Sequence, residues 1–222
     1  MRAFRFLHTE YALQALQTQR LKVALLNELN DPFELFAADL SDRNVRFAFR
    51  QWKNDFAQRT GMLCFSNRWK NPLLWSHYAD RHRGMALGFE IDDNVTVPVR
   101  YRRTRLRLDV ASIVAKDGFS ADLGEDLYAT KSMDWSYEEE VRVPTLLSEC
   151  ELHDGLYFEP LGDQFKIVSV VLGPLCKIDA DDIRRSLPPG SSVNLYHSRM
   201  AFRSFNIVRN KEYPVKQIRG PG

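Results

Sequence analysis

Long apolar runs are missing from this sequence, and so are the cysteine patterns that mark disulfide-rich and zinc-binding proteins. No stretch approaches the roughly 18 to 20 apolar residues of a membrane-spanning helix, and the first residues, MRAFRFLHTEYALQ, lack the apolar segment of a signal peptide. Cys64, Cys150 and Cys176 form neither a C-x-x-C pair nor a zinc-ligand spacing. We therefore expect a cytoplasmic protein with reduced thiols, no membrane partner and no metal site.

An excess of charge of one sign is also missing. The chain has 31 Lys and Arg residues against 29 Asp and Glu residues, so a nucleic-acid partner can be argued only from a local patch. G-x-G-x-x-G and P-loop motifs are absent, which excludes nucleotide binding by those two routes. What remains is an ordinary globular composition, with 44% hydrophobic residues in a chain of 222. It predicts a single domain over residues 1–222.

The order of short patterns predicts an α+β fold. Strands are expected at residues 4–7, 21–26, 62–66, 85–91 and 166–174. Helices are expected at residues 41–60, 71–80 and 120–133, and residues 211–222 are expected to form a tail. Strands outnumber helices and do not alternate with them regularly, which favours a mostly antiparallel split sheet with short flanking helices over a doubly wound parallel sheet.

The first cluster that carries chemistry is N-D-P-F-E, residues 30–34. Proline fixes its own φ and pushes Asp31 out of the helical region, so the stretch predicts a tight turn. In a structural interpretation, Asn30 and Asp31 satisfy backbone groups and Phe33 anchors in the core. In a functional interpretation the loop borders a pocket, and Asn30 or Asp31 faces a ligand.

The second cluster lies in residues 64–89, CFSNRWKNPLLWSHYADRHRGMALGF. Ser66 ends a predicted strand, and Trp75 and Tyr78 lie together on a predicted short helix. Aromatic side chains with polar tips bury their ring faces while one hydrogen-bonding end stays available. Trp75 and Tyr78 are therefore either core residues or ligand contacts.

The third cluster is KSMDWSYEEEVRVP, residues 131–144, and it is the most informative. Side chains of a strand alternate between its faces, so Glu138 and Glu140 are expected on one face together with Arg142. Two carboxylates on one face repel each other, and Arg142 is placed to supply the cation that relieves this. A solvated acidic edge is the alternative, but Trp135 and Tyr137 beside the acids favour a functional site.

A basic strip, VRYRRTRLRL, follows the second cluster. Its arginines are Arg100, Arg102, Arg103, Arg105 and Arg107. In an extended chain, Arg103, Arg105 and Arg107 would share one face with Tyr101, and that face would suit a nucleic-acid backbone. The alternative is a solvated strand paired with local acidic residues.

Together the motifs resemble a bacterial family of domains of unknown function that are often encoded near phage-defence genes. The pattern is N-D-P-F-E, C-F-S, L-W-S-H-Y-A, W-x-Y-E-x-E-x-R and a late strand ending in G-P. It falls here on residues 30–34, 64–66, 74–79, 135–142 and 172–174. A more distant likeness is to ADP-ribosyltransferases, particularly those that modify nucleic acid, and this likeness implies an ADP-ribosyltransferase-like fold with NAD as the substrate.

The likeness to ADP-ribosyltransferases also implies roles for individual residues. Arg5 takes the place of the first-strand His or Arg that holds the NAD ribose, and the usual S-T-S triplet is replaced by C-F-S. Glu140 would grip the ribose 2′-hydroxyl, with Glu138 as its partner, so these two are the predicted catalytic residues. The predicted NAD-binding residues are Arg5, Ser66, Tyr78, Trp75, Asn30 and Arg142.

The leading functional hypothesis is an NAD-dependent ADP-ribosyltransferase-like enzyme that modifies nucleic acid or protein. As a toxin or phage-defence effector it would have an antitoxin or defence-system partner. One alternative is a non-catalytic sensor whose cleft binds a nucleotide or a phage component. A further alternative is a metal-dependent nuclease that uses the acidic pair.

Overall fold

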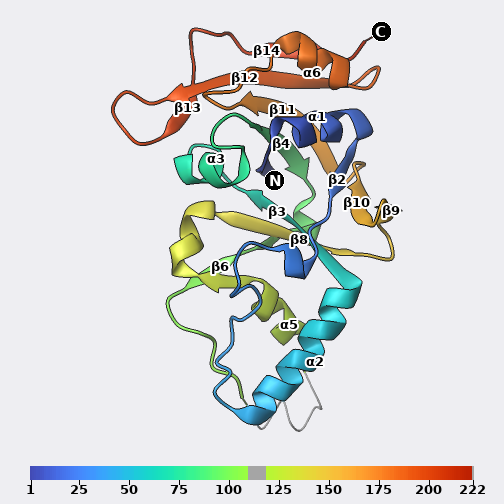
Figure 1. Cartoon of the computed structure of the whole chain (residues 1–222), viewed down its shortest axis with the longest axis vertical. Helices are drawn as coiled ribbons and strands as arrows, with labels where there is room; N and C mark the ends of the chain where they lie inside the picture. Colours follow the sequence, from blue (N-terminus) through green and yellow to red (C-terminus); the bar gives the residue numbers. More distant parts are fainter. Residues whose placement is uncertain (110–118, 222) are drawn as a thin grey trace.

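The computed structural model describes residues 1–109 and 119–221, and the chain forms a mixed α+β structure (Figure 1). Its largest element is a sheet with the strand order β13-β12-β11-β4-β1-β3-β8-β5, and β14 also pairs with β12. β11 and β12 are parallel, and the other pairs of this sheet are antiparallel. The strands are β1 (Arg2–Leu7), β3 (Thr60–Ser66), β4 (Met85–Ile91), β5 (Val97–Pro98), β8 (Glu140–Leu146), β11 (Phe165–Leu172), β12 (Ser192–Met200), β13 (Ile207–Arg209) and β14 (Lys216–Arg219).

Two small sheets and several helices complete the described structure, and they confirm the predicted α+β class. One small sheet has the order β2-β10-β9 and the other pairs β6 with β7 in parallel. Their strands are β2 (Arg20–Lys22), β10 (Leu156–Pro160), β9 (Glu151–His153), β6 (Arg100–Arg102) and β7 (Thr130–Ser132). The helices are α1 (Thr9–Thr18), α2 (Arg43–Arg59), α3 (Pro72–Tyr78), α5 (Ala121–Tyr128) and α6 (Ala180–Ser186), and the 3₁₀ turns are η1 (Leu26–Glu28), η2 (Asp93–Val95) and η3 (Met133–Glu138).

The main sheet is covered on both faces because its central strands are apolar on both sides. On β4, Leu87 belongs to the core cluster that includes residues of α1 and α6, whereas the adjacent Ala86 belongs to the cluster under α3. Neighbouring strand residues point to opposite faces, so α1 and α6 cover one face and α3 covers the other. Trp75 anchors α3: it is fully buried, its Nε1 donates to the Trp69 carbonyl at 2.6 Å, and its ring meets Phe6 edge-on.

α2 forms the lower part of the molecule in Figure 1 and agrees with the helix predicted at residues 41–60. Asp42 caps it, because its carboxylate accepts hydrogen bonds from the backbone N–H groups of Asn44 and Val45. Val45 and Phe49 are buried along one stripe, as the helical spacing predicts. Phe49 packs in one cluster with Ala37 and Ala38 of the loop that follows η1 and with Leu127 of α5, so α2 positions that loop.

Three predicted elements differ from the structure. The strand predicted at residues 21–26 ends at Lys22 and is followed by η1, and the helix predicted at residues 120–133 gives way after Tyr128 to β7. The predicted tail contains β14, which pairs with β12 at the sheet edge. β7 and β14 form because they pair with β6 and β12, although their own sequences have weak strand propensity. No helix in the described ranges has the length and apolar character needed to cross a membrane.

Gly173, in the G-P motif after β11, is expected to tolerate no side chain. A Cβ built there would lie 2.3 Å from the carbonyl oxygen of His82 and 2.7 Å from that of Gly84, and neither backbone atom can move freely. We expect Gly173→Ala to lower the free energy of unfolding by about 1 to 3 kcal/mol. Gly162→Ala is the control, because its Cβ would have nothing within 4 Å. Urea denaturation that shows equal stability for both variants would contradict this close approach.

Candidate functional site

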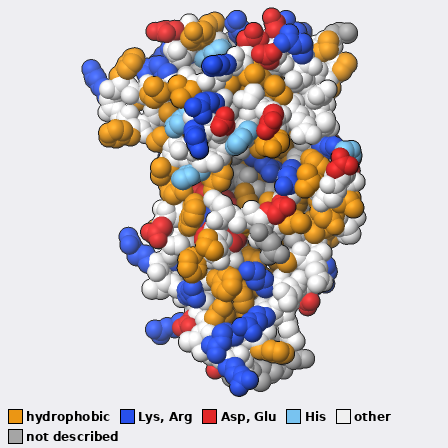
Figure 2. All heavy atoms as spheres, viewed as in Figure 1, with side chains coloured by type: hydrophobic (Ala, Val, Ile, Leu, Met, Phe, Trp, Pro, Cys, Tyr) orange, Lys and Arg blue, Asp and Glu red, His pale blue; other side chains and the backbone are white. Residues whose placement is uncertain are grey.

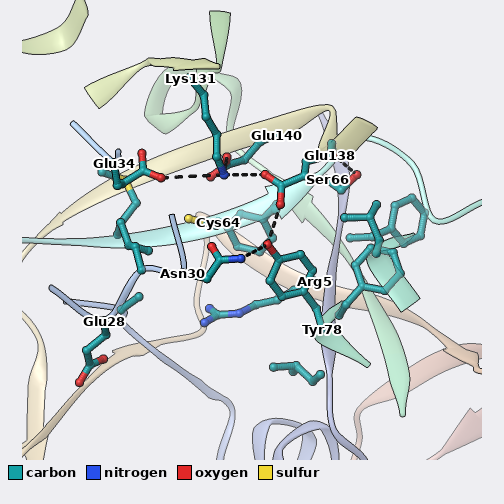
Figure 3. Close-up of a pocket in the computed structure, with 18 residues that line it drawn as sticks. Arg5, Glu28, Asn30, Glu34, Cys64, Ser66, Tyr78, Lys131, Glu138 and Glu140 are labelled. Atoms are coloured by element: carbon teal, nitrogen blue, oxygen red, sulfur yellow. Dashed lines mark hydrogen bonds and ion pairs between the residues drawn. The ribbon is translucent and has the colours of Figure 1, made fainter. Parts of the chain in front are cut away.

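A cavity of about 260 Å³ opens between β1, β3, the start of β8 and the loop that contains η1 (Figure 3). The sheet register brings three strands together here, because Ser66 pairs with Phe4 of β1 on one side and with Glu140 of β8 on the other. The lining residues with polar side chains are Arg5, Glu28, Asn30, Glu34, Cys64, Ser66, Tyr78, Lys131, Glu138 and Glu140. Most of them point toward one another in Figure 3, whereas Glu28 lies apart.

Glu138 and Glu140 reach the cavity by a route that differs from the predicted one. Glu138 ends η3 and Glu140 begins β8, so the two do not share a strand face. Glu139 between them is left-handed, with φ of 43°, a conformation that is uncommon outside glycine. Both carboxylates nevertheless meet at Lys131, whose Nζ lies 2.6 Å from Glu138 Oε2 and 3.2 Å from Glu140 Oε2. A third carboxylate, that of Glu34, lies 3.8 Å from the same Nζ.

Arg142 is the second cation of this network. Its Nε and Nη2 donate to the two oxygens of Glu140 at 2.9 and 3.1 Å, a bidentate pair. Its Nη1 donates to the Tyr128 carbonyl at 2.5 Å and forms an ion pair with Glu34 Oε1 at the same distance. Arg142 is 1% exposed and does not line the cavity. Three carboxylates and two cations leave the network with one net negative charge.

Glu138 faces the cavity through a chain of hydrogen bonds. The Tyr78 hydroxyl donates to Glu138 Oε1 at 2.6 Å, and Asn30 Nδ2 donates to the Tyr78 oxygen at 2.7 Å (Figure 3). Burial and the neighbouring Glu138 carboxylate raise the pKa of Tyr78 well above its usual range, so the phenol stays a donor. Tyr78 and Asn30 therefore fix the position of one oxygen of Glu138.

The two neighbouring glutamates differ in acidity. Burial raises the pKa of Glu138, and this effect outweighs the opposing attraction of Lys131. Burial would also raise the pKa of Glu140, but Arg142 and Lys131 together outweigh it and lower that pKa to about 2. Burial works against the charge of Lys131 as well, yet Glu140 and Glu138 raise its pKa overall. Pairs of carboxyl groups whose environments push their pKa values apart are typical of acid–base sites.

Arg5 brings to the cavity a cation that has no carboxylate partner among the described residues. Its Nη2 donates to the Lys22 carbonyl at 2.7 Å, whereas its Nη1 is buried without a hydrogen-bond partner among the residues that the structure describes. Desolvation lowers the pKa of the Arg5 guanidinium, which means that the folded protein disfavours the isolated charge. An anionic group in the cavity would supply the missing partner. In Figure 3, Asn30 and Tyr78 lie between the Arg5 guanidinium and the carboxylate of Glu138.

Ser66 and Cys64, both on β3, support the site without offering a nucleophile. The Ser66 hydroxyl is within 2.5 Å of the Glu138 carbonyl and 2.9 Å of the Arg68 carbonyl, so it ties the junction of η3 and β8 to β3. Desolvation, together with the nearby Glu140 carboxylate, raises the pKa of the Cys64 thiol well above its usual range. A neutral thiol is a weak nucleophile.

The structure brings together most of the predicted site residues. Arg5, Asn30, Ser66, Tyr78, Glu138 and Glu140 all line the one cavity. Trp75 instead packs in the core between α3 and the main sheet. Arg142 pairs with Glu140 and does not line the cavity. In the N-D-P-F-E loop, Asp31 is buried and accepts a hydrogen bond from the Phe33 N–H, as the structural interpretation predicts. The prediction that Phe33 anchors in the core is wrong, because its side chain is 63% exposed.

Two site residues were not predicted from the sequence. Glu34 is the last residue of the N-D-P-F-E motif, so the motif itself was a signal for it. Lys131 carries no such signal, because an isolated lysine is usually exposed and its burial depends on three acids from other segments.

The basic strip is not the continuous strand that an extended chain would form. β6 ends at Arg102 and the chain then bends, so the predicted shared face of Arg103, Arg105 and Arg107 with Tyr101 is wrong. Tyr101 points inward, where its hydroxyl oxygen accepts a hydrogen bond from the Glu140 N–H at 2.8 Å. Arg100 pairs with Asp126 at 2.7 Å.

Comparison with known proteins finds a family model that matches part of the chain, and it gives no activity. A family model described as a protein of unknown function (DUF2971) matches residues 74–143, so the predicted resemblance to such a family is confirmed for this stretch. The matched stretch contains Tyr78, Lys131, Glu138 and Glu140, whereas Arg5 precedes it. No curated protein and no solved structure matches the chain.

Proposed function

We propose that the cavity binds the nicotinamide–ribose half of NAD and breaks the bond between C1′ of that ribose and the nicotinamide nitrogen. The observation that carries this proposal is the convergence on one cavity of a positioned carboxylate, Glu138, and a cation, Arg5, that has no ion-pair partner among the described residues and whose Nη1 lacks a hydrogen bond. A nucleotide sugar needs both, because its ribose develops positive charge in the reaction and its phosphate is negative. The activity would be that of an ADP-ribosyltransferase-like enzyme.

The size of the cavity limits how NAD would sit. Its volume of about 260 Å³ lies just below the range of roughly 300 to 1,000 Å³ that is common for sites of drug-sized ligands. One half of a dinucleotide therefore fits inside, and the adenosine half would lie across the opening. In this arrangement Arg5 pairs with the phosphate next to the nicotinamide ribose, and the hydroxyl groups of that ribose lie near Glu138.

The reaction can be written with its charges balanced. The C1′–N bond breaks, and its electron pair goes to the nicotinamide nitrogen. Nicotinamide then leaves as a neutral molecule, and the ribose becomes an oxocarbenium ion at C1′. An O–H or N–H group of the acceptor adds to C1′ and loses its proton to a carboxylate, from which the proton passes to water. The carboxylate speeds the reaction because it stabilises the cationic transition state more than it stabilises NAD.

The hydrogen bonds of Glu138 and Glu140 support different roles for the two carboxylates. Both oxygens of Glu140 are taken by Arg142, and one of them also accepts from Lys131, so Glu140 has little capacity left for a substrate. Glu138 accepts only from Lys131 and Tyr78 among the described residues, and each oxygen keeps a free lone pair. We therefore assign the reacting role to Glu138 and assign Glu140 the task of holding Lys131 and Arg142 in place.

The acid side of the pH profile would identify the reacting carboxylate. Glu138 must be ionised to stabilise a cation, and its pKa is raised, so falling pH should switch the activity off above the ordinary glutamate pKa of about 4.3. Glu140, with a pKa of about 2, would stay ionised throughout. The measurement is kcat/KM for nicotinamide release against pH, with circular dichroism to show folding at each pH. A rate that stays flat down to about pH 4 would remove Glu138 from this role.

A non-catalytic sensor is the second candidate, and the charge network is the observation that favours it. The carboxylates of Glu34, Glu138 and Glu140 are each already paired with Lys131 or Arg142, as in a purely structural network. A sensor would bind NAD or a related nucleotide, with Arg5 on its phosphate, and leave it unchanged. It predicts a higher unfolding temperature with NAD and, by mass spectrometry, NAD that is intact after incubation. The enzyme predicts loss of NAD.

A metal-dependent nuclease gains little from the geometry. The Lys131 ammonium lies between Glu34, Glu138 and Glu140, where a metal held by the three carboxylates would have to lie. Cleavage of DNA or RNA in the presence of Mg²⁺ or Mn²⁺ would reopen this alternative. The toxin or phage-defence role that the resemblance implies stays a prediction.

A further inference from the structure

A second cavity, of about 490 Å³, lies on the other side of the N-D-P-F-E loop. Asn30 and Glu34 of that loop face the first cavity, whereas Asp31 and Phe33 line the second. The side chains that matter for its chemistry are Arg102, Arg103, Arg105, Phe33, Trp135 and Lys131.

Basic side chains outnumber acidic ones in the lining of the second cavity. Arg102, Arg103 and Arg105 are exposed and form no ion pair within 4 Å in the described ranges, although Asp39 lies near enough to Arg105 for their charges to attract each other. Two acids also line the cavity and offset part of this positive charge: Asp31 is buried and accepts from the Phe33 N–H, and Asp134 accepts from the Ser132 hydroxyl at 3.1 Å. The arginines are therefore available to an anion from solvent.

Aromatic rings accompany these arginines. Phe33 is 63% exposed, which is costly for a large apolar side chain unless a partner covers it, and the Arg105 guanidinium lies 5.8 Å from its ring centre. Trp135 is half-buried, with Lys131 Nζ 4.6 Å from its ring centre. Accessible aromatic rings beside exposed arginines suit single-stranded nucleic acid, because phosphates bind the cations and unpaired bases stack on the rings.

The surroundings extend the positive field. α2 packs against the loop that contributes Phe36 and Ala37 to this cavity. The helix has one acidic residue, Asp55, and five basic residues: Arg43, Arg46, Arg50, Lys53 and Arg59. Lys53 lies 4.4 Å from the ring centre of Phe36, itself a lining residue. Figure 2 shows Lys and Arg side chains outnumbering Asp and Glu over the lower part of the molecule, where α2 lies. Such a field steers polyanions toward the cavity.

We infer that the second cavity binds single-stranded nucleic acid, with backbone phosphates on Arg102, Arg103 and Arg105 and a base on Phe33 or Trp135. A base that stacks in a concave cavity must be unpaired, which favours a single strand over a duplex. Lys131 lines both cavities, so a bound strand would lie next to the glutamate network. Binding of the strand does not depend on the proposed function, whereas a role of the strand as the acceptor of ADP-ribose would rest on it.

The test is fluorescence anisotropy with a short labelled single-stranded oligonucleotide, without NAD, at several salt concentrations. We compare wild type with the triple variant Arg102→Gln, Arg103→Gln, Arg105→Gln and with the double variant Phe33→Ala, Trp135→Leu. The matched control removes the same charge at the other end of the molecule: Arg203→Gln, Arg209→Gln, Arg219→Gln, all exposed residues on or near β13 and β14. Thermal unfolding shows that each variant is folded.

The inference predicts that the cavity triple variant binds at least about tenfold more weakly and that its slope of log affinity against log salt is shallower by roughly 2, at about 0.7 for each lost phosphate contact. The aromatic variant should bind more weakly with an unchanged slope. The control should bind like wild type. The inference is overturned if wild type does not bind, if the control loses as much affinity as the cavity variant, or if an acidic peptide binds more tightly than the oligonucleotide.

Discussion

Glu138→Gln is expected to slow nicotinamide release from NAD by about 100- to 1,000-fold, which corresponds to roughly 2.7 to 4 kcal/mol of lost transition-state stabilisation. The substitution keeps the shape of the side chain and its bond to Tyr78 but removes the negative charge that faces the developing cation. Since the pKa of Glu138 is raised, the folded protein already disfavours this charge, and a neutral side chain there should fold well. The loss is therefore expected in kcat at nearly unchanged stability.

Glu139→Gln is the matched control for this experiment. It makes the same chemical change one residue away, at a carboxylate that pairs with Arg68 near the surface and does not line the cavity. Tyr78→Phe is expected to give a smaller loss than Glu138→Gln, because it removes one hydrogen bond to the carboxylate and leaves the charge. If Glu138→Gln and Glu139→Gln cleave NAD equally fast, Glu138 has no part in the reaction.

Glu140→Gln is expected to lower the free energy of unfolding by about 3 to 5 kcal/mol, the usual cost of removing one partner from a buried ion pair. Glu140 is 7% exposed, and it neutralises Arg142, which is 1% exposed and whose remaining carboxylate partner is Glu34. The variant leaves the Arg142 guanidinium under-compensated in a place that water does not reach. Urea denaturation of the two proteins measures the difference.

The pH dependence of stability should separate Glu140 from Glu138. The pKa of Glu140 is about 2 in the folded protein and near 4.3 when unfolded, so its contribution is present above about pH 4.3 and is lost as pH falls toward 2. The pKa of Glu138 is raised, so protonation on the acid side favours the folded state. Glu138→Gln should therefore cost far less stability at neutral pH than Glu140→Gln. Equal losses would show that the two carboxylates are not held in different environments.

Local patterns predicted the elements whose own residues decide their structure. β3 and β4 are continuous apolar runs, and α2 has a capping aspartate and one apolar stripe, so all three were found. β7 and β14 are short and polar, and they exist because β6 and β12 offer free edges. Such pairing depends on residues far away in the chain, which no local window contains.

The site residues also divide into those that local patterns predicted and those that depend on contacts formed only after folding. The pattern of acids and aromatics indicated Glu138 and Glu140, although the reason was wrong, since a left-handed Glu139 and not a shared strand face makes them converge. Lys131 could not be found, because its burial follows from three acids that meet only after folding. Trp75 shows the converse: its aromatic character suggested a ligand contact, but the side chain packs in the core.

The most direct measurement is chromatography of NAD after incubation with the wild-type protein, with and without a single-stranded oligonucleotide. If Glu138 and Arg5 form a site for the nicotinamide–ribose half, free nicotinamide should accumulate in proportion to the amount of wild-type protein and should not accumulate with Glu138→Gln. Full recovery of NAD from a protein that is folded under the same conditions would contradict the catalytic proposal.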